Sequence, residues 1–134
     1  FAHLHAALAP GAPLVAQCGG KGNVARLHAA ASEIAAESPY AEHLSDWTGP
    51  WQFAGAEETA ERLDRAGFTD IRTWREPYPI TPPDPPAFFR AVCLGPHLER
   101  LPDGLRDGFV TAVCERCGTE LDYVRLNIDA KKPS

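Results

Sequence analysis

The feature that most constrains the fold is a short, mostly apolar run, Leu14-Val15-Ala16-Gln17-Cys18, which follows Pro10-Gly11-Ala12-Pro13 and leads into Gly19-Gly20. A helix stop, a buried strand and a glycine loop in this order are typical of the middle of an open α/β sheet. Residues 1–9 have the pattern of the end of an amphipathic helix. We therefore expect an α/β fold in which Leu14–Cys18 is a fully buried strand, and we expect the chain to be part of a larger domain.

Hydrophobic spacing and turn residues predict the remaining elements. Helices are expected at 24–37 with Asn23 as N-cap, at 56–66 before Gly67, at 84–95 with Asp84 as cap, at 97–101 and at 102–117. Strands are expected at 68–76 and 121–128, followed by a polar tail at 129–134. The stretch 40–55 has no period and is expected to be irregular, and 77–86, which is rich in proline, is expected to be a surface connector.

Composition limits the classes of partner. With 134 residues and 44% hydrophobic content, the chain can bury one core of ordinary size. The net charge of −5 argues against a nucleic-acid or anionic-membrane surface, because phosphate binding needs clustered Lys and Arg. No apolar run has the length of a membrane helix and no signal segment is recognisable, so we expect a cytoplasmic location with neither nucleic acid nor membrane as partner.

The glycine loop Gly19-Gly20-Lys21-Gly22 invites comparison with phosphate-binding loops. A Walker A motif needs Ser or Thr after the lysine, where this chain has Gly22, and no G-x-G-x-x-G follows the strand. Two interpretations remain open. The loop is either a tight strand-to-helix turn or a ligand-binding loop at the carboxyl end of a strand.

Cysteines and histidines do not form a recognisable centre. Cys114-Glu115-Arg116-Cys117 matches C-x-x-C, but a structural zinc site needs a second such pair and a redox motif opens a helix instead of closing one. We expect reduced thiols and no metal. The five histidines have no ligand spacing and are expected on the surface or half-buried.

The segment Trp47-Thr48-Gly49-Pro50-Trp51-Gln52-Phe53 gathers aromatic side chains in a region without periodicity. Aromatic residues dominate protein cores, so core packing is one interpretation. An irregular, proline-braced segment can equally form a wall of a small-molecule pocket. Both interpretations stay open at this stage.

Several motifs, taken in order, resemble one family. Leu8-Ala9-Pro10-Gly11-Ala12-Pro13-Leu14 is similar to the helix-to-strand turn of class I S-adenosylmethionine-dependent methyltransferases. Ala66-Gly67-Phe68 and the residues around it look like a later helix-strand unit of that fold, and 121–130 looks like its final strand, in the trans-aconitate methyltransferase-like branch. The resemblance covers nearly the whole chain but only the carboxyl-terminal half of the family fold.

The resemblance implies a partial Rossmann-like sheet. This chain would supply the fifth, sixth and seventh strands with flanking helices, and the last strand would be antiparallel and would lie between the other two. The glycine-rich loop and the acidic residue that hold S-adenosylmethionine belong to the amino-terminal half of the family, so no cofactor-binding residue is expected here. The chain departs from the family at Ala12, where a second glycine is more common.

The implied function is transfer of a methyl group from S-adenosylmethionine to a small molecule, with carboxylates as one candidate class, by the intact parent and not by this chain alone. Candidate substrate-binding residues are Gln17, Gly19, Gly20, Asn23, Trp51 and Phe53. Arg26, Arg75 and Arg90 could pair with an acidic substrate, although surface arginines are common. No catalytic residue can be named. The competing interpretation is a non-catalytic α/β module that associates with itself through an exposed edge at Leu14–Cys18.

Overall fold

The computed structural model describes all residues, 1–134, in two compact units. The sheet unit comprises Phe1–Asn23, Gln52–Tyr78 and Tyr123–Ser134. The helical unit comprises Val24–Trp51 and Pro79–Asp122.

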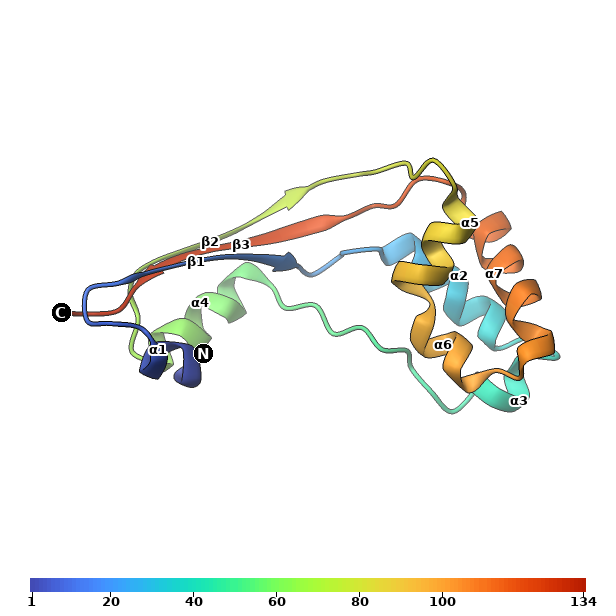
Figure 1. Ribbon diagram of the computed structural model, residues 1–134, viewed down its shortest axis with the longest axis horizontal. Helices are drawn as coiled ribbons and strands as arrows, with labels where there is room; N and C mark the ends of the chain where they lie inside the picture. The colour runs from blue at the N-terminus through green and yellow to red at the C-terminus, as the bar shows by residue number, and fades with distance from the viewer. The chain divides into compact units, whose positions relative to one another are not determined.

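The sheet has three strands, β1 (Pro13–Gly19), β2 (Thr69–Pro77) and β3 (Val124–Lys131), in the order β1-β3-β2. β3 runs antiparallel to both neighbours and lies between them (Figure 1). This order, with β1 at one edge and the last strand in the middle, confirms the strand arrangement predicted from the sequence. The last strand begins and ends later than the predicted range 121–128. Near its start, Leu121 forms only an isolated bridge with Ile80. At its end, the first residues of the expected polar tail pair with β1 as far as Lys131.

Helices pack on one face of this sheet. α4 (Ala56–Arg65) and the short α1 (Ala2–Ala7) lie beside it in Figure 1. The core of the unit consists of the buried residues Leu63, Phe68, Leu126, Ile128 and Ala130. α4 ends where predicted, since Gly67 adopts φ +93°, a left-handed conformation that an L side chain rarely tolerates.

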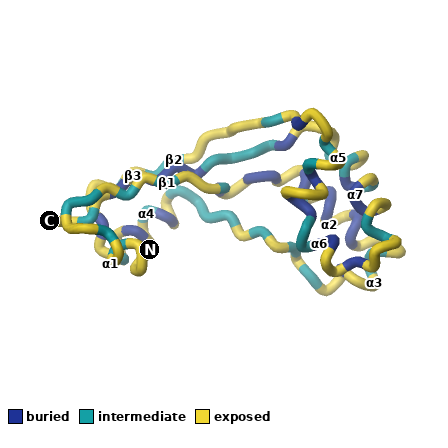
Figure 2. Tube along the Cα trace, viewed as in Figure 1, coloured by how far each residue is buried: buried dark blue, intermediate teal, exposed yellow.

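The prediction that β1 is fully buried is wrong. Leu14 and Ala16 pack against the core, but Val15 is 76% exposed and Gln17 is exposed on the opposite face. The pattern along β1 alternates between exposed and intermediate residues from Pro13 to Gln17, and Figure 2 shows exposed residues along this strand. The physical reason is that successive side chains of a strand point to opposite faces. Only one face of β1 meets helices, so the apolar side chains on its other face stay exposed.

The helical unit is built around α2 (Ala25–Ala35) and α7 (Asp103–Cys117), which lie side by side (Figure 1). Its shorter helices are α3 (Ala41–Leu44), α5 (Pro85–Phe88), the π-helix η1 (Phe89–Cys93) and α6 (Gly95–Arg100). Two expectations need correction. The stretch 40–55 contains α3, and the single helix predicted after Asp84 is divided into α5 and η1. The Asp84 cap is confirmed, because its Oδ1 accepts a hydrogen bond from the backbone N–H of Ala87 at 3.1 Å.

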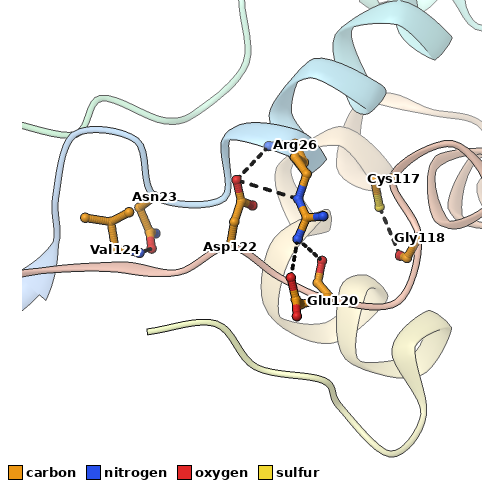
Figure 3. Close-up of polar contacts among 7 residues, drawn as sticks. All are labelled: Asn23, Arg26, Cys117, Gly118, Glu120, Asp122 and Val124. Atoms are coloured by element: carbon orange, nitrogen blue, oxygen red, sulfur yellow. Dashed lines mark hydrogen bonds and ion pairs between the residues drawn. The ribbon is translucent and has the colours of Figure 1, made fainter. Parts of the chain in front are cut away.

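The prediction that Asn23 caps α2 is also wrong. Its side-chain Oδ1 instead accepts a hydrogen bond from the backbone N–H of Val124 at 2.9 Å. The first turn of α2 is capped from a distant part of the chain, because Asp122 Oδ2 accepts from the N–H of Arg26 at 3.2 Å (Figure 3). No helix in the chain combines the length and the apolar character needed to cross a membrane.

Candidate functional site

The loop that follows β1 depends on a close approach of side chains to its backbone. A Cβ atom on Gly19 would lie 2.7 Å from Cε1 of Phe53 and 2.9 Å from Nδ2 of Asn23. A side chain at this position would therefore have to displace the phenyl ring or the amide, which favours glycine. Three of the six predicted site residues, Gly19, Asn23 and Phe53, are thus in direct proximity.

Backbone hydrogen bonds fix the rest of this loop. Gly20 is buried, and its N–H donates to the carbonyl of Val124 at 2.9 Å, while its own carbonyl accepts from the N–H of Asn23 at 2.9 Å. Val24, the residue after the loop, has φ 49°. A left-handed conformation is costly for a β-branched residue, and such strain is concentrated at functional sites. The N–H of Val24 donates to the carbonyl of Asp122 at 3.1 Å, so a hydrogen bond within the fold holds this conformation.

Two small clefts open beside the loop. One, of about 320 Å³, is lined by Lys21, Gly55, Ala56, Glu57, Glu58 and Arg75. The other, of about 200 Å³, is lined by Gln52, Phe53, Ala54, Glu58 and Arg62. The N-terminus of α4 lies at the first cleft, and its N-cap, Gly55, provides no side-chain hydrogen bond. The charges of both signs in these linings suit a small polar molecule, and no Ser, Thr, Cys or Tyr side chain lines either cleft.

The three arginines considered for an acidic substrate differ in their partners. Arg26 pairs with Glu120 at 2.7 Å, and Arg90 pairs with Asp107, so both are neutralised within the helical unit (Figure 3 for Arg26). Arg75 has no carboxylate partner, and its Nη1 donates to the carbonyl of Lys21 at 2.8 Å. Arg75 is the one of the three that lines a cleft at the loop.

Gln17 lies apart from the loop, on the face of the sheet that carries no helix. Its Nε2 donates to Oδ1 of Asn127 at 2.8 Å, and Nδ2 of Asn127 donates to Oε2 of Glu76 at 3.1 Å. The three side chains form a hydrogen-bonded ladder across all three strands. Sequence reasoning missed Asn127 and Glu76, because a ladder depends on strand register, which the sequence alone did not give.

Trp51 belongs to the helical unit, where it packs in an aromatic cluster around His97. The His97 ring lies 4.9 Å from Trp47, 5.3 Å from Trp51 and 5.6 Å from Phe109, measured between ring centroids. His97 is only 3% exposed, so the expectation of surface or half-buried histidines is wrong for it. Burial is the main cause that lowers the pKa of His97 from 6.5 to about 4, followed by the nearby His28 and Arg100.

All four cysteines are free, and no group of three or more His, Cys, Asp and Glu side chains is arranged to hold a metal ion. Cys93 is buried at the end of η1, and desolvation is the main cause that raises its pKa to about 11. Desolvation also raises the pKa of Cys114 to about 11. A thiol with a raised pKa is a poor nucleophile at neutral pH, so neither thiol is suited to catalysis.

Comparison with known proteins gives no independent assignment: no protein-family model and no curated protein matches the chain.

Proposed function

We propose that the chain is the carboxyl-terminal portion, 1–134, of a class I S-adenosylmethionine-dependent methyltransferase. The intact parent would act in the cytoplasm on a small molecule, with carboxylates as the first class of acceptor to test. The observation that carries the proposal is the strand order β1-β3-β2, with an antiparallel last strand between two parallel ones. The family resemblance implies the same order for its fifth, seventh and sixth strands.

In this proposal the residues after β1 contribute to the acceptor side of the site. Gly19, Gly20, Asn23 and Phe53 shape the loop, while Gln17 and Trp51 are further candidate contacts. Methyl transfer from a sulfonium needs little acid–base assistance, because the leaving group is already activated, and orientation of the acceptor supplies much of the rate. The lack of a nucleophile and base near the loop is compatible with such chemistry.

The test is calorimetry with S-adenosylmethionine. We expect no saturable binding to the chain of 134 residues, and binding once the protein is expressed together with the coding sequence ahead of Phe1. In that longer protein, Gln17→Ala and Trp51→Ala should lower kcat more than cofactor affinity. Stoichiometric binding to the chain alone would contradict the proposal that the cofactor half lies elsewhere.

A second candidate is a non-catalytic α/β module that associates through β1, and the 76% exposure of Val15 on this strand favours it. Failure of the longer protein to bind S-adenosylmethionine, together with concentration-dependent association of the chain in sedimentation experiments, would favour this candidate over the methyltransferase.

A further inference from the structure

The segment that carries two of the three tryptophans has little support from its own backbone. This tryptophan segment, Trp47–Trp51, belongs to the helical unit and contains neither helix nor strand. The N–H of Trp47 donates to the carbonyl of Leu44 at 3.1 Å, and no other hydrogen bond between main-chain atoms involves residues 47–51. The position of the segment therefore depends on contacts of side chains.

His28, in α2, contacts the tryptophan segment at three residues. Nε2 of its ring lies 3.4 Å from the carbonyl oxygen of Thr48, within hydrogen-bond distance. A Cβ atom on Gly49 would lie 3.3 Å from the same nitrogen, so the backbone lies against the imidazole. The ring also meets Trp51 edge to face, with the ring centroids 5.1 Å apart. These contacts hold the segment against α2.

His97, in α6, supports the same segment from a second helix. Its ring lies against Trp47 and Trp51, the two ends of the segment. The imidazole is buried, and its Nδ1 has no hydrogen-bond partner. The ring therefore acts on the two tryptophans by aromatic packing and not through a hydrogen bond of Nδ1.

Trp51 is the residue that both histidines contact. The His28 ring is inclined at 73° to the indole ring of Trp51, and the His97 ring is inclined at 46° to it. A tryptophan side chain has only two rotatable bonds, so contacts in two different orientations restrict both of them. The two histidines, one from α2 and one from α6, thus fix the direction of this indole ring.

We propose that His28 and His97 are positioning residues for the methyl acceptor, because they hold Trp51 in the orientation in which it contacts the acceptor. This role rests on the proposed function, in which Trp51 is a candidate contact. Orientation of the acceptor supplies much of the rate of methyl transfer, and a misplacement of about 1 Å can lower a rate about a hundredfold. Loss of either ring should therefore lower turnover and leave the binding of S-adenosylmethionine unchanged.

The first measurement uses the chain of 134 residues labelled with fluorotryptophan, which gives one ¹⁹F NMR signal for each of its three tryptophans. Trp74, in β2, is the internal reference because it belongs to the sheet unit. We expect His97→Ala to move the signals of Trp47 and Trp51 towards the position of the unfolded chain. The signal of Trp74 should stay where it is.

Further variants separate ring packing from loss of stability. His28→Leu removes the second imidazole and should also move the signal of Trp51. His97→Phe keeps an aromatic ring and should leave the signals near their original positions. Val113→Ala shortens a buried side chain of α7 outside the aromatic cluster and should move no signal. The proposal is overturned if neither His97→Ala nor His28→Leu moves the signal of Trp51, or if Val113→Ala moves it as far as they do.

The second measurement is a double-mutant cycle in the longer protein that includes the sequence ahead of Phe1. Its acceptors are a panel of di- and tricarboxylic acids, of which the one methylated fastest is used for the variants. His97→Ala should lower kcat at least about tenfold, with the Kd for S-adenosylmethionine unchanged. In a Trp51→Ala background the same substitution should lower kcat by less than about twofold, because His97 acts through Trp51. Equal losses in the two backgrounds, or a loss that His97→Phe shows as well, would overturn the proposal.

The longer protein without substitutions separates failure of the positioning role from failure of the proposed function. If it binds S-adenosylmethionine and methylates an acid of the panel, and His97→Ala is as active as the original, only the positioning role is wrong. If it binds no S-adenosylmethionine or methylates no acid of the panel, the proposed function is wrong, and the positioning of an acceptor by His28 and His97 is wrong with it.

Discussion

The carboxylate of Asp122 accepts a hydrogen bond from the backbone N–H of Arg26 over 3.2 Å, although the two residues are 96 positions apart. The side chain of Arg26 in turn reaches the carbonyl and the carboxylate of Glu120. The start of α2 and the segment that precedes β3 are thereby joined by several polar contacts (Figure 3). A helix N-terminus favours a negative charge, so this carboxylate acts as a cap supplied from outside the helix.

Replacing this cap should weaken the helical unit. Asp122→Ala removes the acceptor for the N–H of Arg26, and we expect the free energy of unfolding to fall by about 1 kcal/mol. Asp107→Ala is the control, since the Asp107 side chain is 91% exposed and its pairing with Arg90 should contribute less than about 0.5 kcal/mol. Urea unfolding followed by circular dichroism measures both. An equal loss in the two variants would contradict the capping role.

Two glycine-to-alanine substitutions, one in the loop after β1 and one in α7, should change the stability of the fold in opposite directions. Gly19→Ala forces a Cβ into contact with Phe53, and we expect destabilisation by about 1–3 kcal/mol. Gly104→Ala, in α7, meets no atom within 4 Å and should stabilise by about 0.5–1 kcal/mol, because alanine favours a helix. Thermal unfolding distinguishes the two. A neutral Gly19→Ala would mean that Phe53 does not lie against the loop.

The buried imidazole of His97 should make stability depend on pH. Its pKa is about 4 in the native state against 6.5 when exposed, so the unfolded chain takes up a proton as the pH falls through 6.5 while the native chain does not. The stabilisation is therefore complete above pH 6.5 and is lost progressively towards pH 4, by up to about 3 kcal/mol.

The matched variant for this prediction is His97→Phe, which keeps an aromatic ring beside Trp47, Trp51 and Phe109 and cannot titrate. Denaturant midpoints measured between pH 7 and pH 4 should fall more steeply for the original chain than for the variant. Parallel curves for the two proteins would show that other groups cause the acid instability.

Local sequence patterns were sufficient to predict much of the fold. The left-handed stop at Gly67 and the cap at Asp84 depend on residues within a few positions, and both were predicted. The position of β3 between β1 and β2 was predicted from the family resemblance and not from periodicity. The prediction of the cap of α2 failed because the hydrogen-bond partners lie far apart in the sequence. Asp122 caps α2, and the Asn23 side chain accepts a hydrogen bond from Val124 instead.

The candidate site was predictable to a similar extent. Gly19 and Asn23 follow a strand and Phe53 lies in an aromatic segment, which predicts a place at the site for all three, and the structure brings them together. The ladder partners of Gln17 were missed, since they follow from which residues face each other across three strands. The burial of His97 was missed because one histidine in a short helix carries no pattern that separates a surface position from a core position.

Cysteine reactivity is the remaining test of the structure. Cys18 is exposed on β1, whereas Cys93 is buried with a pKa of about 11, so it is both inaccessible and protonated at pH 8. The partly buried Cys114 and Cys117 also have raised pKa values, mainly through desolvation. Because the thiolate is the reactive form, iodoacetamide at pH 8 should label Cys18 first, Cys114 and Cys117 more slowly and Cys93 last. Mass spectrometry of timed samples gives the order, and in denaturant all four cysteines should react at similar rates. Labelling of Cys93 as fast as Cys18 in the native chain would contradict the burial of η1 against α7.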